Sequence, residues 1–171
     1  SGELKFKNAP DYETPLGGLA DNSNTYSLTV KAKDSVGLED TTDLTVQVTD
    51  ESDYSPVIEN VGDTSSASIA ENTTTVAIYT VTDLDAGDTV SWQLSGDDAD
   101  LFEINSSGEL KFKNAPDYET PLGGANDDSN IYSVTVTATD RANLSDSADL
   151  TVNIGDLNEA PVLKVSATSS V

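Results

Sequence analysis

An internal repeat sets the main constraint on how this chain can fold. The residues SGELKFKNAPDYETPLGG at positions 1–18 return unchanged at positions 107–124, which is 106 positions later. The similarity continues further, because TYSLTVKAKD from Thr25 matches IYSVTVTATD from Ile131. A unit of about 100 residues is too long for a solenoid repeat and has the length of a β-sandwich module in a tandem array.

The repeat predicts three parts in the chain. Residues 1–55 are expected to form the C-terminal half of one module, here called the half-module. Residues 56–160 are expected to form one complete module, here called the whole module, and residues 161–171 the first strand of the next. The chain would then be a slice through an array. The alternative is that the half-module takes its missing strands from another copy of the chain.

The hydrophobic pattern of the whole module predicts an all-β fold. Apolar and polar residues alternate in short runs rich in Thr, Val, Ile and Tyr, which is typical of strands. About seven short strands in about 100 residues predict a seven-stranded Greek-key β-sandwich, repeated in tandem. Trp92 has the same parity as Val90 and Leu94, so we expect it in the core rather than in a sugar-binding site. The expected strands are one before Glu71 and those at 76–82, 90–94, 101–104, 109–112, 132–138 and 148–154.

The composition excludes several classes of function. The chain has 31 acidic and 8 basic residues, so its net charge of -23 disfavours nucleic acids and anionic membranes as partners. No run approaches the roughly 18 apolar residues that a membrane span needs, so no membrane insertion of this segment is expected. Cysteine and histidine are absent, which excludes zinc–thiolate sites and the usual nucleophilic triads.

The carboxylates cluster at predicted strand ends and in the linkers between modules. In Asp83/Asp85 and Asp117/Glu119, an extended backbone points both side chains of the pair the same way. The like charges require a cation or a bound proton, and calcium takes 6 to 8 oxygen ligands. Recurrence of the clusters in both copies favours calcium over a merely solvated acidic surface. Glycoside hydrolysis also uses carboxylate pairs, but these pairs lie beside linkers, where no deep cleft is expected, so no enzyme is predicted.

The order of the motifs resembles a cadherin repeat of the bacterial type, from a tandem array in a surface or secreted protein. The motifs are AEN at 70–72, DLDAG at 83–87, LFEINSSGELK at 101–111 before PDYE, YSVTVTATD at 132–140 and DLNEAP at 156–161. The resemblance implies a cadherin/Ig-like sandwich with Ca²⁺ bound at the junctions between successive modules.

The resemblance also implies which residues bind calcium at each junction. At the near junction, between the half-module and the whole module, Ser52 stands where the family usually has Asn, and the Glu of the first motif is missing. At the far junction, after the whole module, the D-x-D pair would lie beyond Val171, so a weak site is expected. The near set is Asp11, Glu13, Asp50, Asp53, Asp83, Asp85 and Asp140, and the far set is Glu71, Asp117, Glu119, Asp156, Asn158 and Glu159.

The resemblance implies a non-enzymatic module of a bacterial extracellular or cell-surface protein. Calcium would stiffen its junctions, and it would act in adhesion or as a spacer. Its expected partners are neighbouring repeats, other copies of the protein or cell-surface polysaccharide. The alternative is a carbohydrate-binding module, for which the candidate aromatic residues are Tyr12, Tyr54, Tyr79 and Tyr118.

Overall fold

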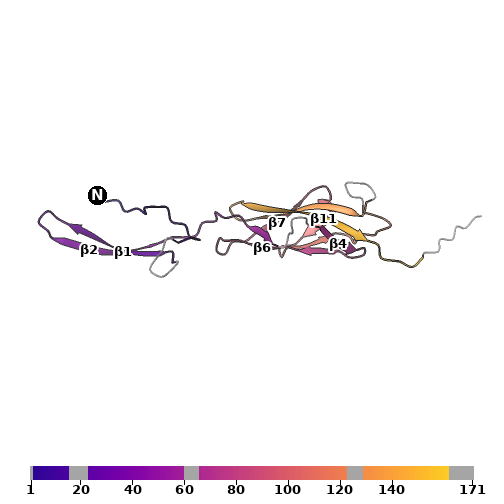
Figure 1. Ribbon diagram of the computed structural model, residues 1–171, viewed down its shortest axis with the longest axis horizontal. Coiled ribbons are helices and arrows are strands. Elements are labelled where there is room, and N and C mark those ends of the chain that lie inside the picture. The colour runs from indigo at the N-terminus through magenta and orange to yellow at the C-terminus, as the bar shows by residue number, and fades with distance from the viewer. Residues whose placement is uncertain (1, 16–22, 60–65, 123–128, 162–171) are drawn as a thin grey trace, which may run out of the picture.

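A computed structural model of the chain describes residues 2–15, 23–59, 66–122 and 129–161. Within these ranges the regular structure consists of strands and a single 3₁₀ turn. Figure 1 shows an elongated molecule in which the half-module and the whole module lie end to end, joined by the extended residues 48–56, here called the linker. The strand expected at the C-terminus falls at residues 162–171, outside the described residues.

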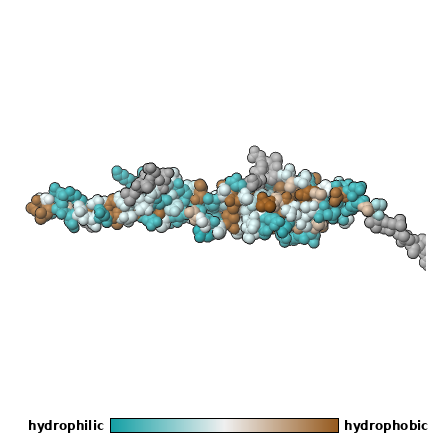
Figure 2. Space-filling view, turned by 90° about the horizontal axis from the view of Figure 1, so that it is seen from below, coloured by the Kyte–Doolittle hydropathy of each residue, from teal (hydrophilic) through white to brown (hydrophobic). Residues whose placement is uncertain are grey.

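The half-module is built on one antiparallel hairpin. Strands β1 (Thr25–Lys33) and β2 (Glu39–Gln47) pair from Thr25↔Gln47 to Lys33↔Glu39. The turn between them carries the exposed Val36 and Leu38, and Figure 2 shows a hydrophobic patch at this end of the molecule. The identical copy of the predicted strand 109–112, the ELKF run at residues 3–6, is not a strand here, and no partner strand pairs with it among the described residues.

The whole module is a sandwich of two layers. One layer is a four-stranded sheet in the order β4-β11-β10-β7. Strands β10 (Ile131–Thr139) and β11 (Ser145–Gly155) form its centre, with β7 (Ser91–Ser95) at one edge. At the other edge β4 (Ser66–Ala70) runs parallel to β11, whereas the remaining pairs are antiparallel.

The second layer consists of two smaller sheets. Strand β3 (Val57–Glu59) pairs with β6 (Thr80–Thr82). Strand β9 (Glu109–Phe112) lies between β5 (Thr75–Ile78) and β8 (Phe102–Ile104), and the 3₁₀ turn η1 (Ala99–Leu101) leads into β8. The described part of the whole module thus has nine strand segments where seven strands were expected. Strand β3 and a break in the strand expected at 76–82 account for the difference.

The break falls at Tyr79, where the chain lies close to Gly108. The Tyr79 N–H donates to the Gly108 carbonyl oxygen at 2.9 Å, in register with the β5–β9 pair Ile78↔Glu109, whereas Thr80–Thr82 pair with β3. A Cβ at Gly108 would lie 2.2 Å from the Tyr79 carbonyl oxygen, and Gly108 has a positive φ of 77°. Only glycine permits this approach. The two halves of the expected strand therefore pair with different neighbours.

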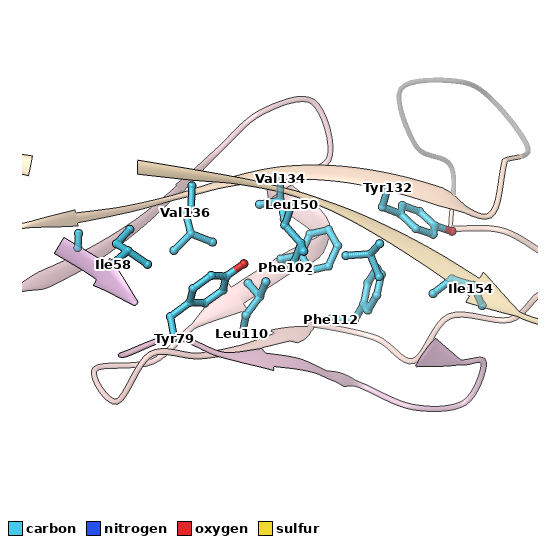
Figure 3. Packing of buried hydrophobic residues seen from close by; sticks show 13 residues of the cluster. Ile58, Tyr79, Phe102, Leu110, Phe112, Tyr132, Val134, Val136, Leu150 and Ile154 are labelled. Carbon is cyan, nitrogen blue, oxygen red and sulfur yellow. The ribbon is translucent and has the colours of Figure 1, made fainter. Parts of the chain in front are cut away.

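The core lies between the two layers, as the alternation predicted. Tyr132, Val134 and Val136 of β10 point inward and are buried, as are the alternate residues of β11 from Ala148 to Ile154. Figure 3 shows them facing Phe102, Leu110 and Phe112 from the opposite layer. Trp92 packs against this cluster, which confirms its predicted place in the core. Each fully buried large side chain stabilises the fold by about 1.5–3 kcal/mol.

Candidate metal sites at the module junctions

At the near junction four carboxylates converge at one end of the whole module. The loop after β6 supplies Asp83, Asp85 and Asp88, and Asp140 follows the last residue of β10. One carboxylate oxygen from each of the four lies within 4.8 Å of the others. We call these residues the four-carboxylate group. Three of its members were predicted, and Asp88 was not.

Several oxygens of this group are buried and have no hydrogen-bond partner. They are Asp83 Oδ2, Asp85 Oδ1 and Asp140 Oδ2. The other oxygen of Asp140 accepts from the Leu144 N–H at 2.8 Å, which fixes the carboxylate in place. A buried polar atom without a partner costs about 1–3 kcal/mol, and more when it is charged. A hard cation at this point would satisfy all three oxygens.

A second group adjoins the first and joins the two modules. Glu13 of the half-module, Asp50 of the linker and Asp85 of the whole module each place one oxygen within 4.8 Å of the others. Glu13 Oε1 and Asp50 Oδ1 are also buried without a partner. Burial, followed by the charges of Asp50 and Asp53, raises the pKa of Glu13 from 4.5 to about 7. Because Asp85 belongs to both groups, it connects them.

Hydrogen bonds hold the linker against the loop that carries the aspartates. The Ala86 N–H donates to Asp50 Oδ2 at 2.8 Å, and the Tyr54 N–H donates to Asp85 Oδ2 at 3.0 Å. The Ser52 hydroxyl donates to Asp88 Oδ2 at 2.6 Å. These bonds leave one oxygen each of Asp50 and Asp85 free to face a cation.

Asp88 lies in an acidic cluster of the sequence but is not among the predicted ligands. Its Oδ1 accepts from Arg141 Nε, and its Oδ2 accepts from Ser52. The Ser52 hydroxyl, together with the Arg141 guanidinium, holds the pKa of Asp88 below its usual value. Asp88 is the third aspartate of the run TDLDAGD, which is the only sequence signal that points to it.

The far junction has a smaller group. Glu71, Glu119 and Asp156 each place one oxygen within 4.8 Å of the others. Glu71 is only 1% exposed and accepts from the Tyr118 N–H at 2.8 Å and the Leu157 N–H at 2.7 Å. A backbone hydrogen bond lowers the pKa of Glu119. Partial burial and the charges of Glu71, Glu159 and Asp156 outweigh that bond and raise it. Both oxygens of Glu71, the buried member of this group, therefore have hydrogen-bond partners.

The remaining predicted ligands lie outside these groups of converging carboxylates. Asp11 Oδ1 accepts from the backbone N–H groups of Glu13 and Thr14, and Asp117 Oδ1 accepts from that of Thr120, so both aspartates shape their loops. The charge of Asp53 acts on Glu13. Glu159 Oε1 accepts from Asn72 Nδ2 at 3.4 Å, and Asn158 is exposed. Their roles as ligands stay predictions.

Comparison with known proteins identifies the family. A model of the cadherin domain matches residues 65–155, more than half of the chain. The chain belongs to the cadherin family. A curated relative of this cadherin is the protocadherin-like wing polarity protein stan of Drosophila melanogaster. It is 34% identical over 154 residues, which are 81% of this chain and 4% of that protein.

Solved cadherin structures share the fold. The mouse clustered protocadherin PcdhgC3 EC1-3 aligns with a TM-score of 0.65 and 21% identity, over 87% of this chain and 46% of that one. The protocadherin gammaB7 EC3-6 cis-dimer structure aligns with a TM-score of 0.59 and 23% identity, over 78% of this chain and 33% of that one. The present chain therefore spans less than half of each of these relatives.

The family establishes several broader points. Cadherin domains are all-β modules of extracellular or cell-surface proteins; they are adhesion modules and not enzymes. Cadherin domains generally bind Ca²⁺, and the acidic groups described above are clustered where such ions would sit. The described residues include no helix long and apolar enough to cross a membrane.

Proposed function

We propose that calcium binds at the near junction and locks the half-module to the whole module. The observation that carries this proposal is the set of buried, unpaired carboxylate oxygens in two adjoining groups that share Asp85. Calcium would be bound by Glu13, Asp50, Asp83, Asp85 and Asp140, and Asp88 would lie beside the ion with its oxygens held by Arg141 and Ser52. Asp11 would hold Glu13 in place, and Asp53 would add negative charge.

The mechanism is electrostatic and mechanical. Without a cation, the carboxylates of the near junction repel one another at short range. A bound cation removes this repulsion and joins three segments: the half-module through Glu13, the linker through Asp50 and the whole module through Asp85. Since the cation binds the assembled junction and not separated modules, it stabilises the assembled state by about 2.7 kcal/mol at a concentration 100 times Kd.

The far junction is proposed as a weaker site in this chain. Glu71 already accepts two backbone hydrogen bonds, so it gains less from a cation. Its ligands would be Glu71, Glu119 and Asp156, with Asp117, Asn158 and Glu159 completing the predicted set. The proposal also keeps the predicted boundaries, in which residues 1–55, 56–160 and 161–171 belong to three successive modules.

Calcium titration of the chain tests the proposal. Calcium should raise the melting temperature and narrow the distribution of interatomic distances in small-angle scattering, relative to a chelated sample. Asp85→Asn should remove most of both effects, because Asp85 serves both groups. Asp97→Asn, an exposed aspartate outside these groups, is the matched control. If chelation leaves both the melting temperature and the scattering distance distribution unchanged, the calcium proposal is wrong.

We further propose that the module acts in adhesion or as a spacer within a tandem array. Neighbouring repeats are its immediate partners. Other copies of the protein are the next candidates, since one solved relative is a cis-dimer. Sedimentation with and without calcium tests self-association, and a monomer under both conditions would favour the spacer role.

The two finer expectations from the sequence have no support in the comparisons. The curated relative is an insect protein, so a bacterial origin is not indicated. A carbohydrate-binding role is not supported by the matched cadherins, and one of its four candidate aromatics, Tyr79, is buried in the core.

A further inference from the structure

We propose that Arg141 is a resident counter-ion of the near junction, which holds the linker in place when calcium is absent and lowers the junction's affinity for calcium. Arg141 acts through Asp88 and Ser52. The statement about affinity rests on the proposed calcium function. The statement about the linker stands without it.

Arg141 forms an ion pair with Asp88, a member of the four-carboxylate group. Asp88 has both oxygens engaged, one by Arg141 Nε and the other by the Ser52 hydroxyl. Its side chain is 0% exposed, whereas that of Arg141 is 66% exposed. One Asp88 oxygen lies within 4.8 Å of the ligand oxygens of Asp83, Asp85 and Asp140. The guanidinium therefore neutralises one of the four converging charges.

The same two hydrogen bonds connect the linker, the loop after β6 and the turn after β10. Ser52 lies in the linker, Asp88 in the loop after β6, and Arg141 in the turn after β10. Removing Arg141 would leave the shielded Asp88 carboxylate without its cation, and an uncompensated shielded charge is destabilising. The chain of contacts therefore orders the junction with no metal ion present.

The counter-ion is specific to this junction. In the half-module, Ser35 occupies the position that corresponds to Arg141. The two turns share their hydrogen bonds, because Asp34 Oδ1 accepts from the Leu38 N–H at 2.8 Å, just as Asp140 Oδ1 accepts from the Leu144 N–H. Serine therefore occupies this position in an equivalent turn, although the two residues that follow it also differ between the copies.

Arg141 has opposite effects on the stability of the ion-free junction and on its affinity for calcium. The positive charge favours the ion-free junction, because it offsets repulsion among the aspartates. It opposes calcium, because a second cation would enter beside it. A residue with a purely structural role would not act this way, since its removal would weaken both the ion-free junction and calcium binding.

The test is Arg141→Ser in the full chain, with Lys113→Gln as the matched control. Lys113 donates to the Asp100 carbonyl oxygen, and it belongs to none of the acidic groups. In chelator, R141S should lower the melting temperature by about 2–5 °C and widen the scattering distance distribution. Calorimetric titration should show calcium binding about two- to fivefold tighter. Arg141→Lys should keep the wild-type calcium affinity.

Each outcome decides one part of the proposal. The proposal fails if R141S matches wild type in chelator, or if it weakens calcium binding together with stability. If calcium binds neither protein, the calcium function fails, whereas the chelated comparison still decides whether Arg141 holds the linker.

Discussion

The half-module and the whole module carry the same eighteen residues and bury them differently. Leu4 and Phe6 are 56% and 41% exposed, whereas their counterparts Leu110 and Phe112 are 0% and 1% exposed. The counterparts lie in β9, which pairs with β5 on one side and β8 on the other. Burial of this sequence therefore depends on the strands beside it and not on its own residues.

Local geometry, in contrast, is the same in both copies. The rings of Phe6 and Tyr26 lie 5.2 Å apart at 80°, and those of Phe112 and Tyr132 have the same separation and angle. Equivalent residues also pair across β1–β2 and β10–β11, from Thr25↔Gln47 and Ile131↔Asn153 onward. The hairpin and its aromatic contact thus form without the second layer of the sandwich. The second layer buries the aromatic pair.

The largest test of this comparison is a matched pair of core truncations. Phe112→Ala should destabilise the whole module by about 3–5 kcal/mol, because it opens a cavity in an enclosed core. Phe6→Ala should cost less than about 1 kcal/mol, since the ring is already partly in solvent. Denaturant unfolding measures the first by Trp92 fluorescence and the second by far-ultraviolet circular dichroism, and equal costs for the two variants would contradict the comparison.

Restoring the missing neighbours should abolish the difference. A chain with a copy of residues 56–106 placed ahead of Ser1 gives the half-module its second layer. In that chain, Phe6→Ala should cost about 3–5 kcal/mol, as at Phe112. Chemical denaturation of the extended chain, with and without the substitution, measures this. A cost that stays below about 1 kcal/mol would show that the added segment does not cover the hairpin.

A third test compares the equivalent glutamates of the two PDYE loops. Glu13→Gln should weaken calcium binding at the near junction about tenfold, which corresponds to about 1.4 kcal/mol. Glu119→Gln should leave that affinity unchanged, because Glu119 belongs to the far group. Calorimetric titration of both variants and wild type separates the sites. Equal loss in both would mean that the strong site had been assigned to the wrong junction.

The smallest expected effect is the pH dependence of the stability of the near junction, which comes from Glu13. In chelator, the pKa of Glu13 is raised to about 7, so its proton is retained by the folded state between about pH 4.5 and 7. Its contribution to the stability of the calcium-free junction is fully present below pH 4.5 and is lost as pH rises through 7. NMR titration of the side-chain carboxyl carbon should give a midpoint near 7, which calcium then lowers. A midpoint near 4.5 without calcium would contradict the assignment.

Much of the fold could be predicted because its determinants are local. Strands were expected at 132–138 and 148–154, and in β10 and β11 alternate residues over these ranges are buried. The break at Tyr79 could not be predicted, since it depends on Gly108, which lies 29 positions further along the chain. The metal ligands, like the strands, could be predicted where their determinants are close together in the sequence. The D-x-D and D-x-E pairs marked their loops, whereas Asp88 depends on contacts with Ser52 and Arg141 from two other segments.

The parallel pairing of β4 and β11 has a consequence for a chain under tension. The pairing runs from Ser66↔Thr151 to Ala70↔Gly155, so five positions lie side by side in two strands that point the same way. When the two ends of the module are pulled apart, these strands slide past each other, and the load falls on all the cross-strand bonds at once instead of opening them singly. In single-molecule pulling, β11 should therefore detach from β4 in one high-force event. A series of small steps would show that the load takes another path.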